Sequence, residues 1–108
     1  MSYEYEMIVC IVNSGFSDAV MSAARAYGAK GGTVLNARGT ANPEAENFFK
    51  ISVQPEKEIV MILVPSAIKD DILRALYEDV GLNTPGQGIA FTLPVDAAVG
   101  LPKNEEKK

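Results

Sequence analysis

The sequence contains no histidine, no tryptophan and a single cysteine, Cys10. A chain with this composition cannot build a Cys/His zinc site, a Ser-His or Cys-His nucleophile pair, or an internal disulfide. The absence of these residue types excludes the most common sets of catalytic side chains, so we expect neither enzyme activity nor a metal site. Cys10 lies in an apolar segment, where a free cysteine packs as a small hydrophobic side chain.

Positive charge and long apolar runs are also scarce. The 10 basic residues stand against 14 acidic ones, for a formal net charge of -4, whereas nucleic-acid binding relies on a basic face. The apolar run Ile59 to Val64 is far shorter than the ~20 residues that cross a bilayer. We therefore expect neither a nucleic-acid partner nor an integral membrane protein.

Two features indicate the compartment. A lone cysteine suits a reducing interior, and the start Met1 to Glu6 lacks the cationic region and apolar core of a signal peptide. We expect a cytoplasmic protein.

What the chain does have is the composition of one packed domain. It has 108 residues, of which 47% are hydrophobic and 22% charged, as in ordinary globular domains. Residues 1–102 are predicted to form that domain. Residues 103–108 are nearly all charged and have nothing to bury, so they are predicted to form a disordered tail.

The pattern of apolar residues predicts four strands and two helices. Apolar runs bounded by turn residues indicate strands at 7–12, 33–38, 57–64 and 89–95. Helical spacing indicates a helix capped by Ser17 and ended by Gly28, and a second one capped by Ser66 and ended by Gly81. The βαββαβ order predicts the ferredoxin-like α+β fold, a four-stranded antiparallel sheet with both helices on one face.

Such a fold leaves the second face of its sheet bare. The run Ile59 to Val64 is apolar on both sides, so large side chains would be exposed unless another subunit covered them. We therefore predict an obligate oligomer. Ile62 and Leu63 must point to opposite faces, and the sequence leaves open which of them faces the core.

Four segments carry a family resemblance. They are Gly28 to Val34, Arg38 to Thr40, Lys57 to Pro65, and Pro85 to Phe91 followed by Leu93 to Val95. Together they resemble the PII nitrogen-regulatory signalling family. The resemblance implies a homotrimer with adenine nucleotides in clefts between subunits. It also implies a mobile T-loop that contacts a regulated transporter or enzyme, in nitrogen metabolism or transport.

The resemblance also supplies most of the predicted site. It implies that the base, ribose and first phosphates of a nucleotide meet Thr33, Gly39, Thr40, Leu63, Gly86, Gln87 and Gly88. Arg38 and Lys57 are the best remaining cations for a phosphate or carboxylate, and Lys57 also matches a family lysine. The predicted partner-binding loop consists of Ala41, Asn42, Pro43, Glu44, Ala45, Glu46 and Asn47. No cofactor is expected to be obligatory, and ATP, ADP or AMP is the expected effector.

Three cationic positions of the family are absent. Ile89, Gly100 and Pro102 stand where a lysine and two arginines meet phosphate in the family. Because charge-assisted hydrogen bonds are the strong ones, we expect ATP binding to be weakened more than AMP binding. The exposed loop is also shorter than that of the family and has no equivalent of the tyrosine that some members modify.

Other readings of the same residues remain open. Gly86 to Gly88 can form a plain turn, Thr33 can cap neighbouring backbone, and Arg38 and Lys57 can be solvated surface cations. The protein as a whole can be a trimeric small-anion-binding or structural PII-like protein that has lost nucleotide sensing. A small ferredoxin-like enzyme is a third class, disfavoured by the lack of histidine and of fixed carboxylate pairs.

Overall fold

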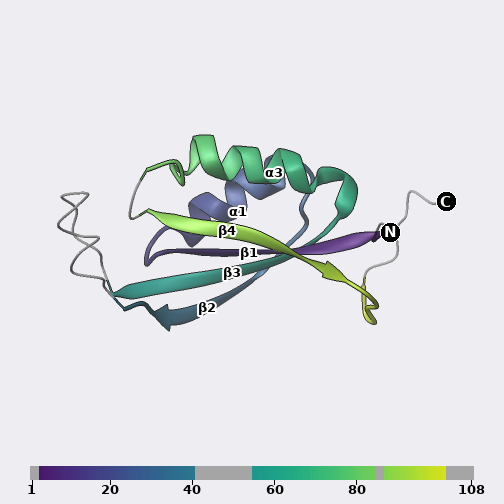
Figure 1. Cartoon of the computed structure of the whole chain (residues 1–108), viewed down its shortest axis with the longest axis horizontal. Helices are drawn as coiled ribbons and strands as arrows, with labels where there is room; N and C mark the ends of the chain where they lie inside the picture. The colour runs from purple at the N-terminus through teal and green to yellow at the C-terminus, as the bar shows by residue number, and fades with distance from the viewer. Residues whose placement is uncertain (1–2, 41–54, 85–86, 102–108) are drawn as a thin grey trace.

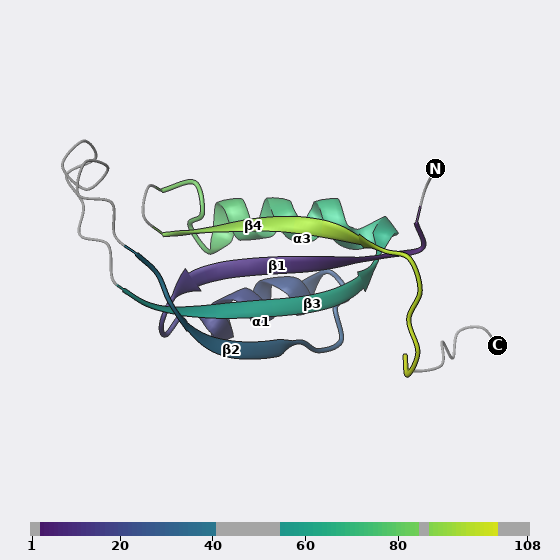
Figure 2. The same ribbon diagram turned by 60° about the horizontal axis from the view of Figure 1, so that its bottom comes forward.

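The computed structural model describes residues 3–40, 55–84 and 87–101. Its elements, in chain order, are β1 (Tyr5–Asn13), α1 (Ser17–Ala26), β2 (Thr33–Arg38), β3 (Glu56–Pro65), α3 (Ser66–Asp79) and β4 (Gly88–Val95). The strands form one antiparallel sheet in the order β2-β3-β1-β4. Both helices cover the same side of it (Figure 1, Figure 2). The predicted ferredoxin-like fold is confirmed.

The hydrophobic core lies between the sheet and the two helices. Ile8 pairs with Ile62 and Cys10 with Val60 across β1 and β3, so these four side chains share one face. All four are fully buried, in one cluster with Val20, Ile72 and Leu76 of the helices. Ile62 is therefore the core residue, and its neighbour Leu63 points to the opposite face.

Burial also explains the chemistry of the lone cysteine. Removal from water raises the pKa of the Cys10 thiol to about 11. At neutral pH the group is a protonated thiol, which is neither a good nucleophile nor a metal ligand. This agrees with its predicted role as a packing residue.

The predictions that Ser17 and Ser66 cap the two helices are wrong. Each serine is the first residue of its helix, preceded by Phe16 or Pro65 at the cap position. The carboxylate of Glu58 takes the capping role at α1, where its Oε1 accepts hydrogen bonds from the backbone N–H groups of Gly15 and Ser17, at 3.1 and 3.2 Å. Its negative charge also suits the positive end of the helix dipole.

Ser66 ties the start of α3 to the segment that leads into β1. Its backbone N–H donates to the carbonyl of Glu4 at 2.9 Å, and its Oγ donates to the carbonyl of Tyr3 at 2.6 Å. The hydroxyl thus bridges two distant segments instead of capping its own helix.

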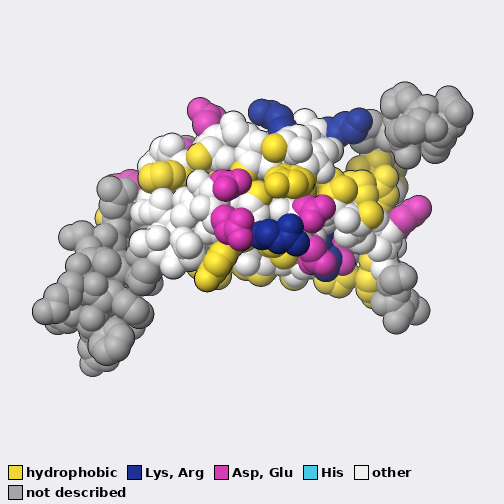
Figure 3. Space-filling model, turned by 90° about the horizontal axis from the view of Figure 1, so that it is seen from above, with side chains coloured by type: hydrophobic (Ala, Val, Ile, Leu, Met, Phe, Trp, Pro, Cys, Tyr) yellow, Lys and Arg dark blue, Asp and Glu magenta, His cyan; other side chains and the backbone are white. Residues whose placement is uncertain are grey.

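The two surfaces of the molecule differ in character. Acidic and basic side chains are scattered over the outer side of the helix layer (Figure 3). Arg74 and Asp71 of α3 form an exposed ion pair, in which Nη1 and Oδ1 are 3.4 Å apart. On the other side no described element covers the sheet. Along this open face the register brings together apolar side chains of all four strands: Met7, Val9, Ile11, Leu35, Ile59, Met61, Leu63, Ile89, Phe91 and Leu93.

The open face exposes large apolar groups. The exposed fractions are 44% for Leu35, 55% for Ile89, 39% for Phe91 and 44% for Leu93. Monomeric proteins rarely leave such a continuous apolar sheet in water. The bare face predicted from the two-sided apolar strands is therefore present.

Candidate functional site

One end of the sheet gathers most of the predicted site residues; we call it the loop end. There β1 and β2 finish while β3 and β4 begin (Figure 1, Figure 2). Lys57 is the ladder partner of both Asn13 and Ala37, and Val12 is the partner of Gly88. The antiparallel register thus places Arg38, Gly39 and Lys57 at the same end of the sheet as Gln87 and Gly88, with β2 and β4 at its two opposite edges.

Lys57 is fixed at both ends of its side chain. Its Nζ donates a hydrogen bond to Asn13 Oδ1 at 2.6 Å. Its methylene groups lie against Gly39, where an added Cβ would come within 3.0 Å of Lys57 Cε. The backbone N–H of Gly39 in turn donates to the carbonyl of Pro55 at 2.7 Å. A side chain at this position would have to displace the flexible lysine chain by a few tenths of an ångström.

Neither Arg38 nor Lys57 forms an ion pair with a described residue. The Arg38 side chain is exposed and that of Lys57 is half-buried. Thr40 is exposed next to Gly39. An anion reaching this end would meet Lys57 opposite the neutral amide of Asn13, and Arg38 opposite Glu56, its ladder partner on β3.

Gln87 and Gly88 have structural roles that sequence reasoning did not separate from ligand binding. Gln87 Nε2 donates a hydrogen bond at 3.3 Å to the backbone carbonyl of Val80, the residue that caps the C-terminus of α3. At Gly88 an added Cβ would lie 2.5 Å from the carbonyl oxygen of Ile11, and φ is +152°. The position tolerates only glycine, whatever it binds. Gly86 lies outside the described residues.

The close approach at Gly88 gives a stability prediction. Gly88→Ala should lower the free energy of unfolding by about 3 kcal/mol or more, because ~1–3 kcal/mol of overpacking adds to ~1–3 kcal/mol of backbone strain. The control is Gly15→Ala, where φ is +100° and nothing lies within 4 Å of the added Cβ, so only strain contributes. Urea denaturation measures both variants, and equal losses would contradict the steric argument.

Thr33 and Leu63 lie away from the loop end. Thr33 begins β2 opposite Met61, and Leu63 follows two residues later on the same open face. Six residues of extended chain separate Thr33 from Gly39, which amounts to about 20 Å at roughly 3.3 Å per residue. One chain therefore holds two separate groups of predicted site residues.

The cationic positions that the chain lacks do not reappear elsewhere at the described loop end. Ile89 lies on the open face as part of the apolar surface. Gly100 follows the end of β4, at the opposite end of the sheet, with φ +94°. Pro102 lies outside the described residues. Arg38 and Lys57 are the two cations of the described loop end.

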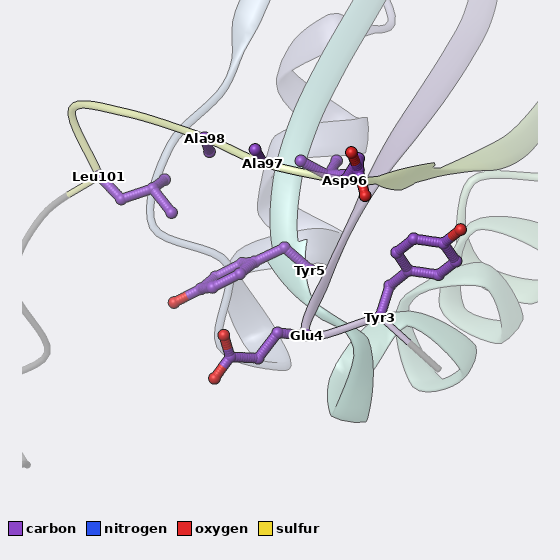
Figure 4. Close-up of a pocket in the computed structure, with 8 residues that line it drawn as sticks. Tyr3, Glu4, Tyr5, Asp96, Ala97, Ala98 and Leu101 are labelled. Carbon is purple, nitrogen blue, oxygen red and sulfur yellow. The ribbon is translucent and has the colours of Figure 1, made fainter. Parts of the chain in front are cut away.

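In the described part of the chain, two of the hollows beside the sheet have no cation among their lining residues. One, of about 380 Å³, lies between α3 and the edge strand β4 and is lined by Leu73, Tyr77, Leu82, Gly88, Ile89 and Ala90. The other, of about 320 Å³, lies between the segments that precede β1 and follow β4, and its charged lining residues are Glu4 and Asp96. Figure 4 shows the Tyr5 ring and the Leu101 side chain, which both line this second hollow. Its carboxylates would repel a phosphate.

Comparison with known proteins identifies the fold. No protein-family model and no curated protein matches the sequence. Among solved structures, Arabidopsis thaliana PII bound to citrate superposes with a TM-score of 0.66 at 22% identity, covering 87% of this chain and 77% of that one. CPII of Thiomonas intermedia K12 is a nitrogen regulatory PII-like protein bound to ADP, AMP and bicarbonate. It superposes with a TM-score of 0.63 at 13% identity, covering 92% of this chain and 98% of that one. The chain has the PII fold.

A third structure agrees. A protein from Thermus thermophilus, described as PII-like and signalling, gives a TM-score of 0.64 at 20% identity over 88% of this chain and 91% of that one. The resemblance read from the sequence segments is thus confirmed at the level of the fold. On this PII fold, the predicted T-loop residues 41–47 lie outside the described residues.

Sequence reasoning missed Asn13 and Glu58. Asn13 contacts Lys57 across 44 positions of the chain, and Glu58 contacts Ser17 across 41. The available signal was strand pairing: antiparallel alignment of 5–13 with 57–65 places Asn13 opposite Lys57. Local patterns alone do not set the register of that pair of strands.

Proposed function

We propose that this protein is a PII-like regulatory protein that assembles as a homotrimer and senses an adenine nucleotide between its subunits. The observation that carries the proposal is the division of the predicted site. Thr33 lies about 20 Å from Gly39, at roughly 3.3 Å per residue, and Leu63 lies farther still along β3, on a chain whose open sheet face is apolar and is covered by no described element. A second copy can supply the missing group while it covers that face.

The ligand class follows from the charges. Arg38 and Lys57 attract phosphate or carboxylate groups. The related structures support the class, since Arabidopsis PII was bound to citrate and CPII to ADP, AMP and bicarbonate. Two cations are few for a triphosphate.

Signalling would pass from the ligand to the T-loop through the loop end. A ligand shifts a conformational equilibrium only by binding one state more tightly than the other. Lys57 packs against Gly39, two positions before the loop residues 41–47. An anion that engages Lys57 thereby biases the conformation at the base of the loop, whose target would be a transporter or enzyme, in nitrogen metabolism or transport.

The alternative is a trimeric PII-like protein that binds small anions and has lost nucleotide sensing. The replacement of three cationic positions by Ile89, Gly100 and Pro102 favours it. We propose a cytoplasmic location for either case. Among the described residues, no helix is long and apolar enough to span a membrane.

Calorimetric titration with AMP, ADP and ATP tests the proposal. All three should bind, and ATP should bind less than about tenfold more tightly than AMP, since the third phosphate finds no additional cation. Arg38→Ala should weaken the binding of each nucleotide, whereas the control Arg74→Ala, at an exposed position on α3, should leave nucleotide binding unchanged.

Two results would count against this assignment. ATP binding a hundredfold tighter than AMP, about 2.7 kcal/mol, would mean that other cations replace the missing ones. Binding of inorganic phosphate or citrate with no binding of any nucleotide would favour the alternative.

A further inference from the structure

Lys57 is presented in an unusual way for a surface lysine. Its partner is a neutral amide oxygen, Asn13 Oδ1, at 2.6 Å. Asn13 and Lys57 are direct ladder partners on neighbouring strands, so their side chains lie on the same face at the shortest cross-strand separation. An amide oxygen fixes an ammonium group without neutralising its charge, whereas a carboxylate would cancel it.

The neighbouring carboxylates are kept away from this ammonium. Glu58 follows Lys57 in β3 and therefore points to the helix side, where its Oε1 accepts from the N–H groups of Gly15 and Ser17. Glu56 precedes Lys57 and points to that side for the same reason. The lysine is thus held by a neutral group, between acidic neighbours that are turned away.

We propose that Asn13 is a positioning residue that prepares Lys57 for an anion. A lysine ammonium has three N–H donors; one is taken by Asn13, which leaves two for a phosphate or carboxylate oxygen. A free lysine side chain must give up rotamer entropy on binding, whereas here the contacts with Asn13 and Gly39 have already restricted it. The inference rests on the proposed function, in that the anion is part of its effector.

The hold on Lys57 can be measured without a ligand. Acylation of lysine amines with acetic anhydride, quantified by mass spectrometry, should proceed severalfold faster at Lys57 in Asn13→Ala than in the wild type, because the amine loses its partner. Lys69, on α3, is the internal reference. The control variant is Asn36→Ala, an exposed asparagine on β2. An unchanged Lys57 rate in Asn13→Ala would overturn the proposal.

The effect on binding is measured by titration with ADP and with inorganic phosphate, which separates a nucleotide from a free anion. Asn13→Ala should weaken binding about fivefold through the regained rotamer freedom of the lysine. Asn13→Asp should protect Lys57 from acylation yet weaken binding more, because its carboxylate pairs with the ammonium. If Asn13 had a purely structural role, the acylation rate of Lys57 and the affinity for the anion would not both fall in Asn13→Asp.

The outcomes distinguish the two proposals. Equal or tighter anion binding by Asn13→Ala, with the wild type binding normally, overturns the positioning role and leaves the proposed function standing. If the wild type binds neither ADP nor phosphate, the proposed function fails and the anion-preparing role fails with it. The acylation rates then still decide whether Asn13 holds Lys57.

Discussion

Ile62→Asp is expected to abolish folding. Ile62 is fully buried between the sheet and the helices, so the substitution loses about 2–5 kcal/mol of packing and transfer free energy. It also places an unpaired carboxylate in the core, which costs several kcal/mol more. The sum is comparable to the whole stability of a small domain, ~5–15 kcal/mol. Loss of the far-ultraviolet circular dichroism signal measures the outcome.

The matched variant is Leu93→Asp, which introduces the same charge on the opposite face. Leu93 is 44% exposed in the single chain and pairs with Met7 on the open face. The chain should keep its fold because the carboxylate remains hydrated there. Its mass by light scattering should fall from that of three 11.6 kDa chains to that of one, since a charge cannot be buried against another subunit without a partner.

The pair of variants separates the two faces. A folded Ile62→Asp would contradict the assignment of the core. A wild-type protein that is monomeric at micromolar concentration, or a Leu93→Asp variant that keeps the wild-type mass, would contradict the use of the open face as an interface.

Local patterns in the sequence were enough to predict the element order and the sheet. The strand predicted at 33–38 matches β2 residue for residue, because glycines flank it on both sides. β1 starts two residues earlier than predicted, at Tyr5. Tyr5 and Glu6 are not markedly apolar as a pair, but they find ladder partners in Pro65 and Val64, and those partners are set by the fold.

The candidate site was predictable in composition but not in arrangement. Arg38 and Lys57 were recognisable as cations beside glycine segments. Their lack of ion pairs among the described residues, and the contact of Lys57 with Asn13, depend on which strands pair and in which register. The same limit explains the wrong helix caps: Ser17 is a good capping residue by type, but Glu58 reaches the end of α1 from a neighbouring strand.

The separation of Thr33 from the loop end likewise follows only from the extended course of β2. A linear sequence shows Thr33 and Gly39 six positions apart, which would be close in a helix. In a strand they lie at opposite ends. Because of this separation, we propose that a working site combines the loop-end group of one chain with the group around Thr33 of another chain.

Subunit complementation tests that claim most directly. Lys57→Glu disables the loop-end group, and Thr33→Glu disables the other, so neither variant alone should bind ADP. The two proteins are unfolded together in equal amounts and refolded, and native mass spectrometry confirms mixed trimers.

In a ring of identical head-to-tail interfaces, about one quarter of the clefts then join two intact groups. We therefore predict that calorimetry will recover about a quarter of the wild-type ADP sites. Mixed trimers that bind no ADP would contradict a site shared between subunits, because they would show that both groups must act within one chain.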